Sequence, residues 1–140
     1  MQVMNATQVR NEWSAVLDSV IREKPLFIKR TRDKMIISDL VTLESLLSAY
    51  SFHAEVFSED DGSVTLSLDC IDLVENGRDL DDALIKMSKS ILEYAVMFYE
   101  DFTYWARGDR TAHIPFVFKA LVLNDIGKIG ELIQCRLGES

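Results

Sequence analysis

Apolar residues in the first part of the chain recur with a helical period. After a short alternating stretch over residues 1–6, which predicts a strand, they return at three- and four-residue steps from Val9 to Ile21. This spacing predicts one amphipathic helix with a single buried stripe. We expect Thr7 to cap the helix and Pro25 to end it, because a proline disfavours helical geometry at the residue before it.

The period then changes to that of strands. Residues 26–30 and 35–38 are β-runs separated by the polar turn at residues 32–34, which predicts a hairpin with a strongly basic tip. Residues 39–50 form a second, shorter helical pattern rich in leucine. The pattern therefore predicts a βαββα unit over residues 1–50.

A second hairpin and a long helix are predicted beyond this unit. Residues 52–57 lead through an acidic turn closed by Gly62 to residues 64–68, where apolar and polar residues alternate with a clean period of two. Asn76-Gly77 marks another turn. Asp79 then caps a helical pattern that runs almost to Gly108.

The end of the chain combines aromatic and apolar residues. The second half of the long helix holds more aromatic side chains than one small hairpin can cover, so we expect some of them to contact another chain. An apolar stretch and a final helix over residues 125–135 follow. The candidate partner-binding residues are Phe102, Trp105, Pro115, Phe116, Phe118, Leu121 and Leu123. A helix pair that closes the core, or a dimer interface, is the alternative for this region.

Charge divides the chain into two parts. Residues 1–50 hold seven basic and six acidic residues, a net charge of +1, whereas residues 51–140 hold eight basic and seventeen acidic residues, a net charge of −9. Such asymmetry indicates two surfaces with different partners. For the second part alone, a solvated acidic surface that keeps the protein soluble explains the charge equally well.

Composition and motifs argue against several functional classes. The carboxylates of residues 59–61 form a run at a predicted hairpin tip, which is normally a solvated turn, and His53 and His113 are isolated from other ligand-type residues. Cys70 lies beside acidic residues that weaken it as a nucleophile, and Cys135 is far from it in sequence. We expect no enzyme activity, no cofactor and no metal site.

Location follows from the same composition. The 140 residues contain no apolar run of the roughly 18 needed to span a bilayer, and the opening residues lack the pattern of a signal peptide. Two cysteines without CxxC spacing are not a secreted disulfide framework. We expect a cytoplasmic protein with no membrane partner.

Side chains suited to DNA gather at the start of the first predicted helix and on the hairpin after it. Asn, Gln and Arg read base edges through paired hydrogen bonds, and Lys and Arg also contact phosphates. The candidate DNA-binding residues are Asn5, Thr7, Gln8, Arg10, Asn11, Arg30 and Arg32, with Lys29 and Lys34 beside them. A polar cap followed by a solvated hairpin is the alternative that composition alone leaves open.

The order of these segments resembles the Phd/YefM (prevent-host-death) antitoxin family over residues 1–50. The resemblance is carried by MQVMNATQVRNEWSAVLDSVI, then PLFIKR and MIIS, with Arg10, Ser14, the Val16-Leu17 and Val20 stripe and the Ile28-Lys29-Arg30 run. It implies a dimer that pairs these small sheets and binds a palindromic operator, with Arg10 as the strongest contact. Trp13 and the glycine-free turn at residues 32–34 depart from the family's usual pattern.

Residues 52–95 also resemble the HicB-like antitoxin fold, in which a hairpin with an acidic-glycine turn precedes a long helix. The helix opens here as Gly77-Arg78-Asp79-Leu80-Asp81-Asp82-Ala83, but Ile71-Asp72-Leu73 stands where that family has a proline and a glycine-cysteine pair. The resemblance implies a partner-binding module rather than an enzyme. An ordinary ββα domain without a special partner is the alternative.

These observations predict an α+β protein with a βαββα DNA-binding and dimerisation unit (1–50) and an acidic unit (51–140) made of a hairpin, a long helix and a helical tail. The resemblances imply an antitoxin of a type II toxin–antitoxin system. Such a homodimer, or higher homo-oligomer, represses its own operon at operator DNA and neutralises a small RelE-like or Doc-like toxin. A stand-alone DNA-binding autoregulator, whose C-terminal unit only mediates oligomerisation, is the alternative.

Overall fold

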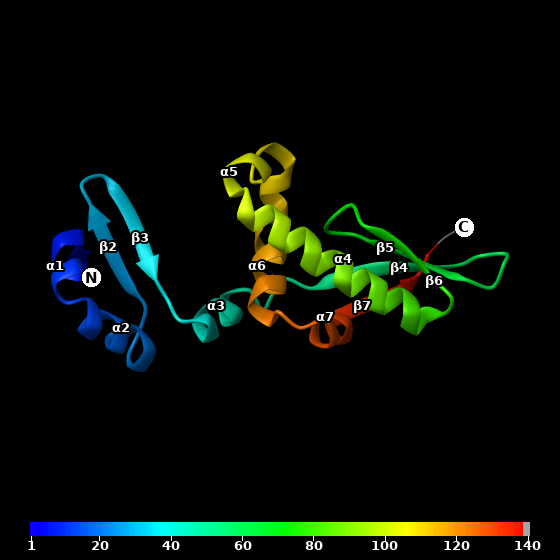
Figure 1. Cartoon of the computed structure of the whole chain (residues 1–140), viewed down its shortest axis with the longest axis horizontal. Helices are drawn as coiled ribbons and strands as arrows, with labels where there is room; N and C mark the ends of the chain where they lie inside the picture. The colour runs from blue at the N-terminus through cyan, green and yellow to red at the C-terminus, as the bar shows by residue number, and fades with distance from the viewer. Residues whose placement is uncertain (139–140) are drawn as a thin grey trace. The chain divides into compact units, whose positions relative to one another are not determined.

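The computed structural model describes residues 1–138 and has two compact units, and the boundary along the chain falls between Leu46 and Leu47 (Figure 1). The described residues form seven α-helices and two mixed β-sheets, one sheet in each unit. The predicted α+β class is therefore confirmed. The division falls at the end of a short helix rather than after residue 50.

The first unit is a three-stranded sheet with helices. Its elements are β1 (Met4–Asn5), α1 (Ala6–Asn11), α2 (Trp13–Arg22), β2 (Leu26–Arg30), β3 (Asp33–Ile37) and α3 (Leu40–Leu46). β2 lies in the centre of the sheet, parallel to β1 and antiparallel to β3. The buried core consists of only four aliphatic side chains, Val9, Val16, Val20 and Ile28.

Two predictions about the first helix are wrong. The cap is Asn5 rather than Thr7, because the Asn5 side chain accepts the N–H of Gln8 at 2.8 Å. The helix is also interrupted at Glu12, whose backbone (φ −115°, ψ 32°) leaves the helical region. A periodic sequence pattern does not reveal such a local break, because side-chain spacing is preserved across it.

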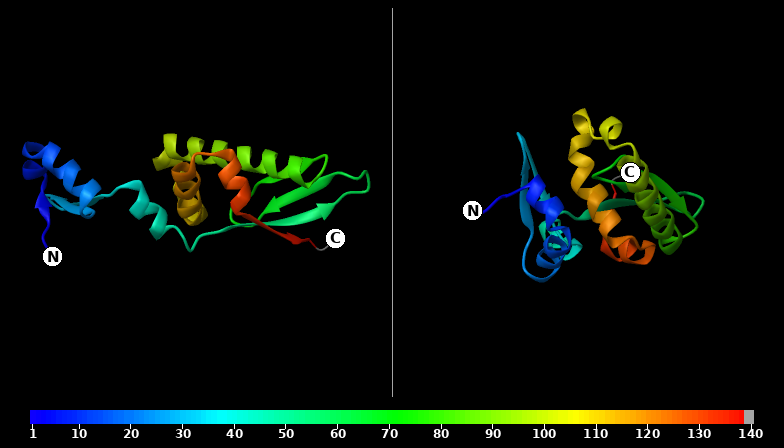
Figure 2. Two further views of the ribbon diagram at one scale, coloured as in Figure 1. Left: turned by 90° about the horizontal axis from the view of Figure 1, so that it is seen from below. Right: turned by 60° about the vertical axis from the view of Figure 1, so that its left-hand side comes forward.

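The second unit is built on a four-stranded sheet. Its elements are β4 (Phe52–Ser58), β5 (Val64–Leu68), β6 (Val74–Gly77), α4 (Leu80–Glu100), α5 (Phe102–Trp105), the 3₁₀ helix η1 (Gly108–His113), α6 (Ile114–Leu123), α7 (Ile126–Leu132) and β7 (Ile133–Leu137). The strand order is β6-β5-β4-β7, and β7 runs parallel to β4. The helix α4 packs across one face of this sheet, and α6 and α7 pack against α4 (Figure 2).

The helix α4 organises the core of the second unit. Asp79 caps it by accepting the N–H of Asp82 at 2.8 Å, as the sequence predicts. Its buried face contacts side chains from the sheet and from α6 and α7. The side chains of this face are Ala83, Met87, Ser88, Ile91, Ala95 and Phe98, at three- and four-residue steps. The opposite face of α4 stays available for other contacts.

Three predictions about the second unit need correction. A third strand, β6, ends at the predicted Asn76-Gly77 turn, and α4 ends at Glu100, well before Gly108. The apolar stretch of residues 116–123 belongs to the helix α6, in agreement with a helical segment there. The final helix, predicted over residues 125–135, stops at Leu132, and the strand β7 follows it. β7 was missed because it pairs with β4, a strand distant in sequence, and local periodicity does not sense such a partner.

Candidate DNA-binding and partner-binding surfaces

A polar groove of about 570 Å³ lies where β1, α1 and the end of β2 meet in the first unit. We call it the basic groove; it is lined by Asn5, Ala6, Thr7, Arg10, Lys29, Arg30 and Thr31. Three of these residues are cationic and none is acidic. Their charged groups form no ion pair with another described side chain. The groove is therefore a positively charged recess that an anionic backbone can approach.

Strand pairing brings the two halves of the basic groove together. The parallel pairing of β1 with β2 places Asn5 opposite Lys29, and α1 begins at the next residue after Asn5. The groove therefore combines residues that are more than twenty positions apart in sequence. Because the Asn5 carboxamide oxygen already accepts the Gln8 N–H, this side chain holds the start of α1 in place.

The hairpin between β2 and β3 turns through Thr31 and Arg32, since Arg30 pairs with Asp33. Thr31 has φ 54°, in the left-handed region that a β-branched residue rarely adopts. This conformation costs on the order of 1–2 kcal/mol. The hairpin tip is therefore at Thr31 and Arg32 rather than at residues 32–34. Thr31 occupies the position of the turn that favours glycine.

The structure brings together four of the seven predicted DNA-binding residues. Asn5, Thr7, Arg10 and Arg30 line the basic groove, whereas the exposed Gln8, Asn11 and Arg32 do not. The groove also includes Thr31, which the sequence did not single out.

Arg10 also borders a second recess of the first unit. This apolar recess of about 650 Å³ is lined by Ala6, Val9, Arg10, Trp13, Ile28, Met35, Ile36 and Ile37. Along α2, the side chains of Trp13, Leu17 and Ile21 follow one another every four residues and are 37–69% exposed. The predicted single buried stripe is therefore split, and half of it faces outward.

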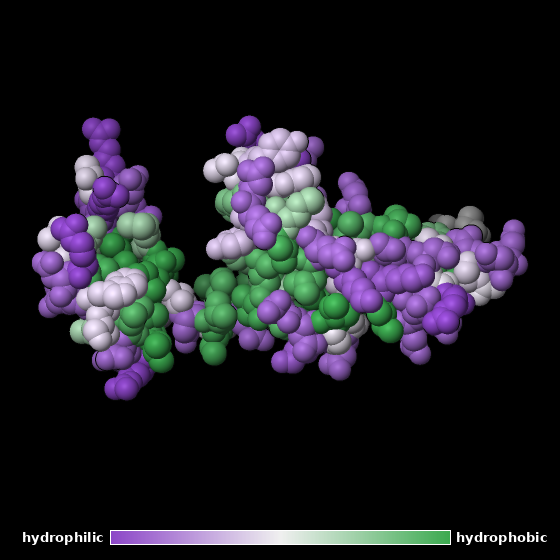
Figure 3. Space-filling view, viewed as in Figure 1, coloured by the Kyte–Doolittle hydropathy of each residue, from purple (hydrophilic) through white to green (hydrophobic). Residues whose placement is uncertain are grey.

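The sheet of the first unit adds to this apolar surface. Phe27 and Ile36 lie opposite each other on β2 and β3, and each is about half exposed (44% and 51%). β3 is an edge strand of the sheet. Figure 3 shows apolar side chains at the surface of this unit over β2 and β3. An exposed apolar surface of this kind, next to an unpaired edge, is typical of an interaction site.

The predicted partner-binding residues of the second unit divide into two groups. Trp105, Phe116, Leu121 and Leu123 pack against the hydrophobic core and so help to close it. Phe102 and Phe118 instead form an edge-to-face pair near the surface, which Tyr99 joins (centroids 6.1 and 6.2 Å). Pro115 is half-buried in the first turn of α6. The alternative given by the sequence for this region, a helix pair that closes the core, therefore describes most of these residues.

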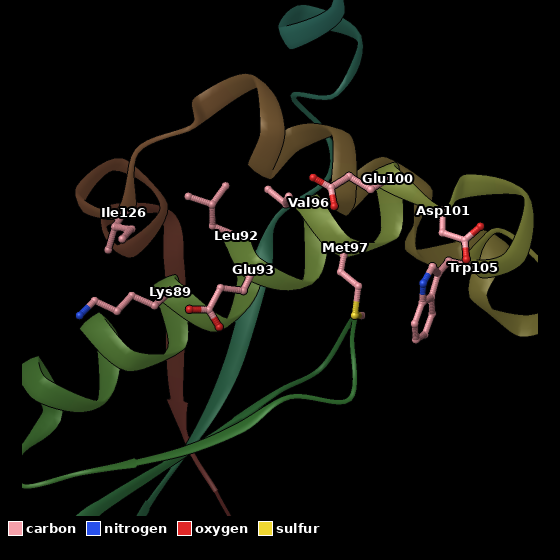
Figure 4. Close-up of a pocket in the computed structure, with 9 residues that line it drawn as sticks. All are labelled: Lys89, Leu92, Glu93, Val96, Met97, Glu100, Asp101, Trp105 and Ile126. Carbon is pink, nitrogen blue, oxygen red and sulfur yellow. The ribbon is translucent and has the colours of Figure 1, made fainter.

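The outer face of α4 carries a recess of the second unit. It has a volume of about 660 Å³ and extends from Ile126, at the start of α7, to Trp105 (Figure 4). We call it the α4 groove. Its apolar residues are Leu92, Val96, Met97, Trp105 and Ile126, and its charged ones are Lys89, Glu93, Glu100 and Asp101. Sequence reasoning missed most of this groove, because its α4 residues lie between the buried positions of the helix.

A polar cluster lies near the other side of α4. The Tyr94 hydroxyl and His113 Nδ1 are 2.7 Å apart and form a hydrogen bond. Burial lowers the pKa of His113, an effect that Asp72 opposes and Arg110 reinforces. Burial also raises the pKa of Tyr94. This partly buried hydrogen bond ties η1 to α4.

The two cysteines are free, and the pKa of each thiol is raised. Burial, with a smaller contribution from Asp69, raises the pKa of Cys70 to about 11. Burial also raises the pKa of Cys135, on the exposed strand β7. Neither residue has the lowered pKa that a nucleophilic cysteine needs.

Within residues 1–138 no group of three or more His, Cys, Asp or Glu side chains is arranged to hold a metal ion. None of the helices in this part of the chain combines the length and apolar character needed to cross a membrane.

Sequence comparison decides the family. Residues 1–135 match the family described as "PHD_like: Antitoxin of toxin-antitoxin, RelE / RelB, TA system". The chain belongs to this antitoxin family. Its members act with a cognate toxin, and antitoxin folds of this type are typically non-enzymatic. The expectation of a toxin–antitoxin antitoxin is therefore confirmed at the level of the family.

A solved structure supports the same assignment. The antitoxin is similar to a crystal structure from Syntrophomonas wolfei subsp. wolfei, described as the antitoxin part of a proposed toxin/antitoxin system. The two chains are 32% identical, with a TM-score of 0.92 over 99% of this chain and 100% of that one. No curated protein sequence matches this chain significantly.

Proposed function

We propose that this antitoxin binds operator DNA as a homodimer, represses its own operon and neutralises a small toxin through its acidic second unit. The observation that carries the DNA-binding part is the basic groove. Arg10 from α1 and Lys29 and Arg30 from β2 line one recess without any acidic residue. Arginine and lysine in such a recess hold phosphates, and arginine also reads guanine by paired hydrogen bonds.

The small size of the first unit supports a dimer. Four buried aliphatic side chains make a marginal core for 46 residues, since a unit this small buries little of its surface on folding. A second copy would cover the exposed ridge of Trp13, Leu17 and Ile21 or extend the sheet at β3. Two-fold symmetry of the dimer would then match a palindromic operator.

The charge of the second unit supports toxin binding. Residues 51–140 carry a net charge of −9, and toxins that act on RNA tend to be basic, so the two surfaces are electrostatically complementary. A RelE-like or Doc-like toxin fits this description. The Phd/YefM character of residues 1–50 and the HicB-like character of residues 52–95 remain predictions that accompany this proposal.

The DNA-binding part is tested by Arg10→Ala in a gel shift on the DNA upstream of the gene. Loss of one base contact costs about 1–3 kcal/mol, and a dimer loses it twice. Arg22→Ala is the matched control, because Arg22 is an exposed arginine at the far end of α2 outside the basic groove. Equal affinity of the Arg10→Ala variant and the unmodified protein would remove the basic groove as the DNA site.

The other two parts need their own measurements. Sedimentation should give a mass of twice the 16.0 kDa of one chain, for the unmodified protein and for Arg10→Ala alike. Co-expression with the protein encoded by the adjoining reading frame should give a stable complex. A monomer that retains full DNA affinity contradicts the dimer, and the absence of a complex contradicts toxin neutralisation.

A further inference from the structure

The α4 groove is an apolar recess with an acidic border. Two rows of α4 side chains line it, each with a four-residue step. One row is formed by Lys89, Glu93 and Met97, and the other by Leu92 and Val96. The groove between two such ridges is the surface into which a second helix packs. Val96 and Met97 remain 39% and 42% exposed, although each is flanked by other apolar side chains.

Three carboxylates border this floor without partners. Glu93, Glu100 and Asp101 form no ion pair with any side chain in residues 1–138. Lys89 is the only cationic residue that lines the groove, so its border has a net charge of −2 from three acids and one base. Figure 4 shows Glu100 and Asp101 near the Trp105 end and Glu93 beside Lys89.

The position of two of these acids on α4 is unfavourable within the chain itself. Glu100 is the last residue of α4 and Asp101 follows it, and the last turn contains no basic residue. The C-terminal end of a helix carries about half a negative charge, so carboxylates there repel it. A cationic partner at this end of the groove would relieve that repulsion.

We propose that the α4 groove binds an amphipathic helix of the toxin, with a ridge of large apolar side chains flanked by lysines or arginines. The apolar floor would take the ridge and the three carboxylates would pair with the basic flanks. This inference rests on the proposed toxin-neutralising function and names the surface and the chemistry that the function would use.

A second copy of this chain fits the groove less well. In a two-fold symmetric interface the same patch meets itself, so two borders that each carry a net charge of −2 would come together. Like charges opposed in this way cost free energy on association. The basic side chains of a cationic helix would instead be attracted to the carboxylates of the groove.

The chemistry of the groove can be measured with a defined probe. The probe is an 18-residue amphipathic peptide of leucine and lysine, and the matched peptide has glutamate at every lysine position. Binding is followed by the fluorescence of Trp105 in a Trp13→Phe background, which leaves Trp105 as the only tryptophan. We expect the lysine peptide to bind at least about tenfold more tightly, with an affinity that falls as salt is added.

Two variants of the groove and two matched controls locate the binding. Met97→Asp and the double variant Glu93→Lys/Glu100→Lys should each weaken the lysine peptide about tenfold. Ile85→Asp and Glu131→Lys place the same changes on exposed residues of α4 and α7 outside the groove, and should leave binding unchanged. The double variant should unfold at the same or a higher temperature, since Glu100→Lys replaces an acid at the end of α4 with a base. Its loss of binding would therefore not come from unfolding.

The outcomes separate the groove from the function. Equal binding of the two peptides, or equal effects of groove and control variants, would overturn the inference. If the co-expressed toxin binds the groove variants as well as the unmodified antitoxin, the groove assignment is wrong while toxin neutralisation stands. If no toxin complex forms at all, the proposed function fails, and the peptide measurements still decide the chemistry of the groove. A lower oligomeric mass of Met97→Asp would show that a second copy covers the groove and would also overturn the inference.

Discussion

Gly77 is the last residue of β6, and the backbone of the first turn of α4 passes directly against it. A Cβ atom at this position would lie 2.3 Å from the amide nitrogen of Ala83 and 2.7 Å from its Cα. Ordinary contact of a Cβ begins at 3.4 Å, so strand and helix would have to separate by about 1 Å. Both neighbours are backbone atoms, which do not move aside as a flexible side chain does.

That separation would disturb the start of α4. Asp82 accepts the N–H of Arg78 at 2.9 Å and donates its own N–H to Asp79 at 2.8 Å. Loss of a helix cap costs about 1 kcal/mol and an overpacked contact about 1–3 kcal/mol. We therefore expect Gly77→Ala to lower the free energy of unfolding of the second unit by about 2–4 kcal/mol. Because α4 carries the α4 groove, binding of the lysine peptide should weaken as well.

Urea unfolding followed by Trp105 fluorescence in the Trp13→Phe background reports on the second unit. Gly62→Ala is the matched control: Gly62 lies in the β4–β5 turn with φ +86°, and an added Cβ there meets nothing within 4 Å. Its cost is backbone strain alone, about 1 kcal/mol. If Gly77→Ala and Gly62→Ala lower the stability equally, α4 does not pack on β6 as described and the reasoning fails.

Two further predictions concern titratable groups. The pKa of His113 lies below its ordinary value of 6.5, so the folded chain binds this proton less readily than the unfolded chain. Stability should therefore fall as the pH drops through the ordinary range of histidine, and His113→Gln should flatten this part of a stability–pH profile; an unchanged profile would contradict the assignment. For the thiols, a pKa of about 11 leaves Cys70 roughly one part in a thousand ionised at pH 8, so Cys135 should react first with a disulfide reagent. Faster labelling in Cys135→Ser than in Cys70→Ser would refute the order.

Local patterns in the sequence determined much of this protein. The alternation of residues 64–68 and the acidic turn before them predicted the β4–β5 hairpin, and Asp79 predicted the start of α4. The charge division between the two parts of the chain is likewise a property of composition. These features depend on interactions within a few residues, which is the range over which periodicity and capping act.

Only the tertiary structure decided which residues share a surface. β7 pairs with β4 and places Ile133 opposite Phe52. No local sequence pattern marks a strand partner about eighty positions away. The same holds for the basic groove, where the pairing of β1 with β2 brings Arg10 near Lys29 and Arg30. The periodicity around Trp13 predicted an apolar helix face, but burial depends on what packs against that face. In a unit with so small a core, half of it remains open to a partner.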